Sequence, residues 1–101
     1  MSPPSGEWAS ATLHAFYPGM LSDIRIRETV MAAAHGIAER TGVELKYVQV
    51  EDDYLTVEVR GSLLIAMALL AELRRSTEQW HMSHGDGPLW KKDSDQSEPE
   101  A

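Results

Sequence analysis

Apolar and polar residues change their spacing several times along the chain, and each change marks a different predicted element. The longest apolar run is residues 63–71, in which no side chain is polar. Its Leu, Met and Ala residues favour a helix. Ser62 can cap the start, and the positive charges of Arg74 and Arg75 suit the negative end of a helix. The pattern predicts a helix from Leu63 to about Gln79.

The faces of this predicted helix are informative because apolar residues surround nearly all of it. Helical spacing puts Ile65 and Leu69 roughly opposite the main apolar stripe, with Leu64 on the flank. That stripe consists of Leu63, Met67, Leu70 and Leu73. Burial of a large apolar side chain contributes about 1.5–3 kcal/mol, so leaving the back of the helix in water forgoes several kcal/mol. We therefore expect another part of the chain, or a second copy, to cover it.

Two elements are predicted before the hairpin. Residues 8–17, WASATLHAFY, alternate in part, which favours a strand, although frequent alanine leaves a short helix as an alternative. Residues 21–41 carry apolar side chains at helical spacing and end before Gly42, a typical helix stop. Ser22 or Asp23 can cap this helix. The alternation over residues 23–27 leaves a later start open, and we favour the longer helix.

Residues 43–60 contain two runs rich in strand-forming residues on either side of Asp52 and Asp53. A turn at these two residues predicts that Val50 pairs with Leu55, Val48 with Val57, and Lys46 with Val59. The apolar face of this hairpin is expected to receive the helices. Leu45 and Tyr47 are expected on the opposite face, which is only half polar and therefore also expected to be covered in part.

The predicted order is strand, helix, strand, strand, helix, followed by the aromatic segment 80–92, which either closes the sheet or lies as coil over the core. This α+β order, β-α-β-β-α(-β), resembles in pattern the ferredoxin-like sandwich, an antiparallel sheet with two helices on one face. We expect a single domain over residues 7–92. Residues 1–6 are expected to be a disordered lead, and residues 93–101 a disordered acidic tail.

Composition narrows the possible partners. The net charge is −7, and subtracting the four acids of residues 93–101 leaves −3. A mildly acidic domain lacks the basic stripe that nucleic-acid binding requires. The apolar run is shorter than the roughly 20 residues of a membrane span. With no cysteine and no apolar leader at the start, the chain is expected to be cytoplasmic, without disulfides.

One group of residues has the character of metal ligands. His81 and His84 lie three positions apart, and Asp86 follows them, so the three could bind a divalent metal. The alternative is a surface segment in which the histidines bond to carbonyl groups or to solvent. We assign no catalytic residue and no cofactor, because no motif specifies a reaction.

The sequence thus favours a small structural or interaction module over an enzyme. We expect it to self-associate, as a homodimer, through the apolar helix and the hairpin sheet. The predicted interface residues are Ile65, Leu69, Leu64, Tyr47 and Leu45. The alternative is a metal-binding or small-ligand-binding domain, or an enzyme, that uses the segment from His81 to Asp86.

Overall fold

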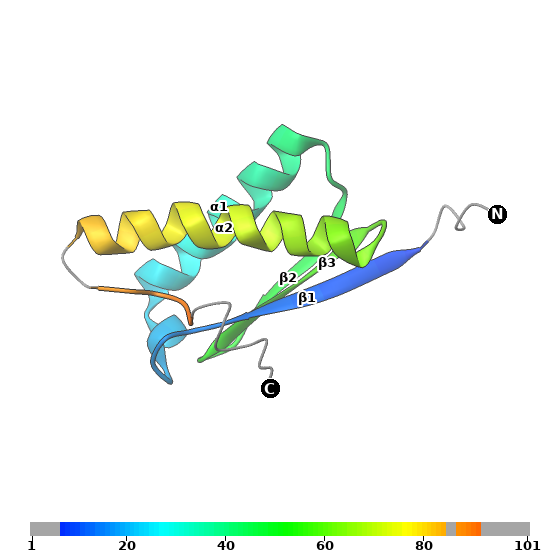
Figure 1. Cartoon of the computed structure of the whole chain (residues 1–101). Coiled ribbons are helices and arrows are strands. Elements are labelled where there is room, and N and C mark those ends of the chain that lie inside the picture. Colours follow the sequence, from blue (N-terminus) through cyan, green and yellow to red (C-terminus); the bar gives the residue numbers. More distant parts are fainter. Residues whose placement is uncertain (1–6, 85–86, 92–101) are drawn as a thin grey trace, which may run out of the picture.

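The computed structural model describes residues 7–84 and 87–91, which form an α+β fold (Figure 1). Its elements are β1 (Trp8–His14), a short 3-10 helix (Met20–Ser22), α1 (Ile24–Thr41), β2 (Leu45–Val50), β3 (Tyr54–Arg60) and α2 (Leu63–Ser83). The sheet is antiparallel in the order β1-β3-β2. Both helices pack against one of its faces, and none of the described residues forms a helix on the other face.

The strand predicted within residues 8–17 is confirmed over Trp8–His14, and the longer form of the first helix is confirmed from Ile24, after a short 3-10 helix at Met20–Ser22. The Asp23 side chain accepts a hydrogen bond from the Arg25 N–H at 2.9 Å and caps α1. Gly42 ends the helix with a φ of 78°, a left-handed conformation that glycine adopts without a side-chain penalty. These local signals fix where α1 lies between the strands.

The predicted hairpin register is confirmed at its tip and wrong at its base. Val50 pairs with Leu55 and Val48 with Val57, as expected, but Val59 pairs with Leu45 instead of Lys46. The register shifts between Leu45 and Tyr47, because an extra residue in β2 forms a bulge. The shift turns Leu45 toward the helices, where it packs at the margin of the core.

The core lies between the helices and a single face of the sheet. Leu55, Val57 and Val59 of β3 are fully buried at the centre of this face. The helix residues packed against the sheet are Val30, Ala34, Ile37 and Ala38 of α1, with Ala66, Leu69, Leu70 and Leu73 of α2. The alternating burial of β3 follows from its pleat, since successive side chains point to opposite faces.

The predicted facing of α2 is wrong for several residues. Leu69 is buried, whereas Leu63 and Met67, expected in the buried stripe, are 54% and 55% exposed. The helix also continues to Ser83, and its buried stripe runs on through Thr77 and His81. The buried face of α2 thus includes two polar residues. Because the first half of the helix is apolar nearly all round, the sequence alone did not reveal which side of α2 faces the core.

Residues 87–91, called the closing segment below, follow α2 and cover the core next to the end of β1. Trp90 is 1% exposed and forms an antiparallel bridge with Ala15. The Phe16 N–H donates to the Leu89 carbonyl at 2.8 Å, and the Lys91 N–H donates to the His14 carbonyl at 2.9 Å. The described residues therefore form three strands and one isolated bridge instead of four strands. The predicted lead and acidic tail, residues 1–6 and 93–101, lie outside the described residues.

Candidate interaction surface

The first half of α2 exposes large apolar side chains while its opposite face forms part of the core. Leu64 is 75% exposed, Met67 55% and Leu63 54%. Isolated apolar residues are common on protein surfaces, but a cluster on one helix marks an interaction site more often. These three residues are called the apolar flank below.

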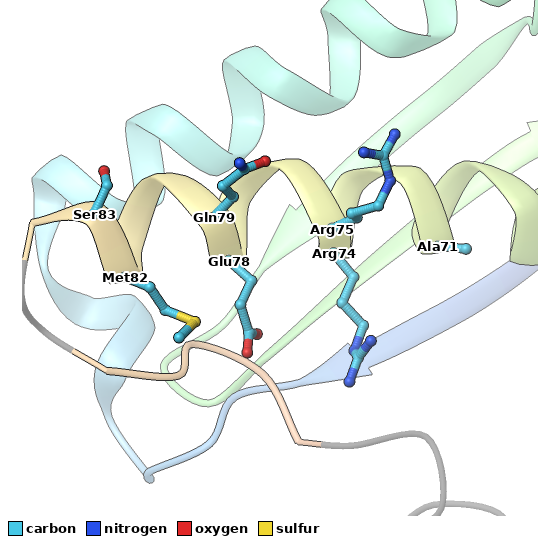
Figure 2. A pocket seen from close by; sticks show the side chains of 7 residues that line it. All are labelled: Ala71, Arg74, Arg75, Glu78, Gln79, Met82 and Ser83. Atoms are coloured by element: carbon cyan, nitrogen blue, oxygen red, sulfur yellow. The ribbon is translucent and has the colours of Figure 1, made fainter.

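The charged side chains of Glu78 and Arg74 show which part of the structure this side of α2 faces. The Trp90 N–H donates to Glu78 Oε1 at 3.1 Å, and Arg74 Nε donates to the Lys91 carbonyl at 3.4 Å. Figure 2 shows both side chains directed from α2 toward the closing segment. Helical spacing puts Leu63 and Met67 on the same side of α2 as these contacts. Leu63 and Met67 therefore lie on the β1 side of the helix, and Leu64 lies next to them on the side that faces away from the core.

Below this side of α2 lies the outer edge of β1. The Ala15 N–H donates to the Asp53 carbonyl, and the Gly61 N–H donates to the Glu7 carbonyl, so odd-numbered residues of β1 bond toward β3. Even-numbered residues then point their backbone groups outward, as the bonds of His14 and Phe16 to the closing segment show. Among the described residues, nothing pairs with the outward groups of Trp8, Ser10 and Thr12.

Two shallow grooves accompany α2, and neither is an enclosed pocket. One, of about 720 Å³, follows the exposed side of the second half of the helix (Figure 2). All seven side chains that line it belong to α2, so it is the surface of one helix. The other, of about 500 Å³, lies between α1 and α2 and is lined in part by Ile65 and Ala68. No convergent polar cluster marks either groove as a catalytic site.

An ion pair network spans the second groove and joins the two helices. Glu72 of α2 accepts from Arg75 at 2.6 and 2.7 Å and lies 3.5 Å from Arg40 of α1. The hydrogen bond from Arg75 and the charges of both arginines lower the pKa of Glu72 below its ordinary value, against a smaller opposing effect of desolvation. The network links the end of α1 to the middle of α2.

The face of the sheet without helices is polar and aromatic. Trp8 lies under two cations, with Lys46 Nζ 5.2 Å and the Arg60 guanidinium carbon 4.7 Å from the ring centre. Tyr47 is 40% exposed, and partial burial together with Glu58 raises its pKa. Cations stacked on an aromatic ring stabilise this face by modest amounts. The face is half polar, as the sequence indicates.

The two histidines of the predicted metal site, His81 and His84, differ in burial. His81 is 4% exposed, and its Nδ1 lies 2.8 Å from the Gly87 carbonyl, so Nδ1 carries the proton and donates. His84 is exposed, with Nδ1 2.9 Å from the Trp80 carbonyl. Asp86 lies outside the described residues. Within residues 7–84 and 87–91, no group of three or more ligand-type side chains could hold a metal ion.

The five predicted interface residues divide into two sets. Leu69 lies in the core and Leu45 packs at its margin, whereas Leu64, Ile65 and Tyr47 are exposed. Sequence reasoning missed Leu63, Met67 and the edge of β1. The lack of charge and proline in residues 8–13 was an available signal of an unprotected edge, but it required knowing that β1 borders the sheet.

No family model matches the chain, and no curated protein matches it. None of the helices in the described part of the chain has the length and apolar character that crossing a membrane requires. Function is therefore argued from the surface itself.

Proposed function

We propose that this protein is a small interaction module that self-associates as a homodimer through the apolar flank of α2. The observation that carries the proposal is the exposure of Leu63, Leu64 and Met67 on a helix that already buries its other side. Burial of each would contribute up to about 1.5–3 kcal/mol. A contact that covers all three would recover several kcal/mol that the isolated chain forgoes.

The polar open face and the lack of a convergent polar cluster in the described grooves support an interaction role over a catalytic one. Trp8 stacks with Lys46 and Arg60 on this face. In the two described grooves, the hydroxyl groups of Ser83 and Thr41 donate to backbone carbonyls of their own helices and not to a base. Direct binding of nucleic acid is disfavoured by the net charge of −7.

We also propose that the architecture is a ferredoxin-like sandwich in which the closing segment is the described part of the fourth strand. In that pattern the last strand lies antiparallel beside the first. The bridge between Ala15 and Trp90 has this direction and lies at the outer edge of β1. Because the described part of this fourth element ends at Lys91, the described residues leave the start of β1 and the overlying flank of α2 uncovered.

Light scattering coupled to size-exclusion chromatography tests the self-association. The chain should elute with the mass of two copies at high micromolar concentration, and Leu64→Glu should shift it to a monomer. Ile24→Glu is the matched control, because Ile24 is also exposed, at 61%, but lies at the start of α1. A wild-type monomer throughout the concentration range would contradict the proposed function.

The alternative function is binding of a divalent metal by His81, His84 and Asp86. Its support is that both histidines bond through Nδ1 to carbonyl groups, an arrangement that leaves Nε2 as the ligand atom in many metal sites. Zinc added to the untagged protein should then raise its melting temperature, and His84→Ala should remove the effect. An unchanged melting temperature in the wild type would count against this alternative.

A further inference from the structure

We propose that two copies pair through the outer edges of their β1 strands, antiparallel and centred on Ser10, to form one continuous six-stranded sheet. This inference rests on the proposed self-association and names its geometry. Its first support is the set of outward backbone groups on Trp8, Ser10 and Thr12, which no described residue satisfies. An extended strand added to such an edge gains main-chain hydrogen bonds.

The residue at the centre of the pairing follows from which outward backbone groups of β1 are still free to form hydrogen bonds. The outward carbonyl of His14 already accepts from Lys91, so the closing segment limits the open part of the edge to residues 8–12. An antiparallel arrangement that uses every open group must therefore be symmetric about Ser10. Trp8 then faces Thr12 of the second copy, and the three pairs supply about six hydrogen bonds between the chains.

The apolar flank fits the same arrangement. α2 begins beside the start of β1, where the Gly61 N–H donates to the Glu7 carbonyl, and the two run side by side (Figure 1). Four residues of helix advance about 6 Å, which is close to the advance of two residues of strand. Met67 therefore lies roughly level with Ser10 along the edge. In the symmetric pair, the Met67 side chains of both copies approach each other across the two-fold axis.

The opposite edge of the sheet is protected, which favours β1 as the pairing edge. β2 carries a bulge between Leu45 and Tyr47 and a charged residue, Lys46, within it. Bulges and lysines are common devices against edge pairing. Residues 8–13 of β1, WASATL, contain no charge, no proline and no bulge. The β2 edge of the sheet is therefore protected against pairing, and the β1 edge is open over residues 8–12.

The occupant is a second copy of this chain and not its own last residues. Ten residues, KDSDQSEPEA, follow Lys91, and they include four acids, one proline and no large apolar side chain. Such a segment cannot cover Leu63 and Met67 with apolar surface. A second copy brings the same two residues from its own α2 and is complementary by symmetry.

A single-cysteine experiment tests the register, because the natural chain has no cysteine. Paired Ser10 residues would have their Cα atoms about 5.5 Å apart, within the range that a disulfide spans. Ser10→Cys should form a covalent dimer under mild oxidation on the order of tenfold faster than Gln49→Cys, because pairing raises the local concentration of the thiol. Gln49 is the control, since it is exposed on the same face but belongs to β2.

A second variant tests the backbone bonds. Ser10→Pro removes one outward N–H, which does not bond to β3, so the monomer should retain its fold by circular dichroism. The variant should be a monomer by light scattering, whereas Ser10→Ala, which keeps the N–H, should remain a dimer. A noncovalent dimer that survives Ser10→Pro and forms no Ser10→Cys disulfide would overturn this geometry while leaving self-association intact.

Two further outcomes separate the competing explanations. A wild-type monomer would remove both the proposed function and this geometry. A full-length monomer that becomes a dimer when residues 92–101 are deleted would show that the chain's own end occupies the edge, and it would overturn the second copy as the occupant.

Discussion

Leu64 and Leu69 are the same residue type on one helix, yet one is 75% exposed and the other 3%. Leu69→Ala should lower the free energy of unfolding by about 2–5 kcal/mol, because it leaves a cavity between α2 and the rest of the core. Leu64→Ala should change the stability of the monomer by less than about 0.5 kcal/mol. Urea unfolding at low protein concentration measures both. Equal losses would mean that the orientation of α2 is different.

Only part of the apolar flank could be predicted from the sequence. Leu64 could be identified because it lies in an unbroken apolar run. Leu63 and Met67 could not, because Thr77 and His81 share the buried stripe and shift it away from the most apolar side. Hydrophobicity alone cannot orient a helix whose first half is apolar all round.

At the scale of elements, Glu72 joins α2 to Arg40 of α1. Since its pKa is lowered, the ionised form is favoured in the folded state, and its contribution is complete above the ordinary value of 4.5. The contribution is lost as the pH falls through the lowered pKa. Glu72→Gln should therefore reduce the melting temperature slightly at pH 7 and make no difference at strongly acidic pH.

The control for this prediction is Glu39→Gln, which removes the same charge from an exposed position of α1. Melting curves from pH 7 to pH 3 should show a difference for Glu72→Gln that shrinks with acidity, and little difference for the control. A constant effect of Glu72→Gln at every pH would mean that packing, and not ionisation, is responsible.

The elements themselves were predictable where local chemistry specifies them. Asp23 and Gly42 delimit α1, and alternating β-branched residues around Asp52 and Asp53 specify the hairpin tip. The bulge in β2 could not be predicted, because it depends on which side chains the helices accept and not on any turn residue. The edge position of β1 was likewise hidden, since strand order is a property of tertiary packing.

At the scale of the whole molecule, Trp90 connects the end of the described chain to its first strand and last helix. Its indole Nε1 donates to Thr77 Oγ1 at 2.9 Å in a buried site. Trp90→Ala should cost about 3–5 kcal/mol, a large part of the roughly 5–15 kcal/mol of a typical domain. Trp90→Phe should cost less, because it keeps most of the packing and loses mainly the hydrogen bond.

Denaturant midpoints of the two variants and the wild type check this ranking. Trp80→Ala is a suitable control, because Trp80 is only partly buried on the same helix as Thr77. An unchanged midpoint for Trp90→Ala would show that the closing segment is dispensable for the fold.

The bulge between Leu45 and Tyr47 has a consequence for the size of any assembly. A pair joined at β1 has only the two bulged β2 strands at its outer limits, and these are poor templates for another strand. Growth should therefore stop at two chains, and concentrated solutions should contain discrete particles of uniform mass instead of fibres.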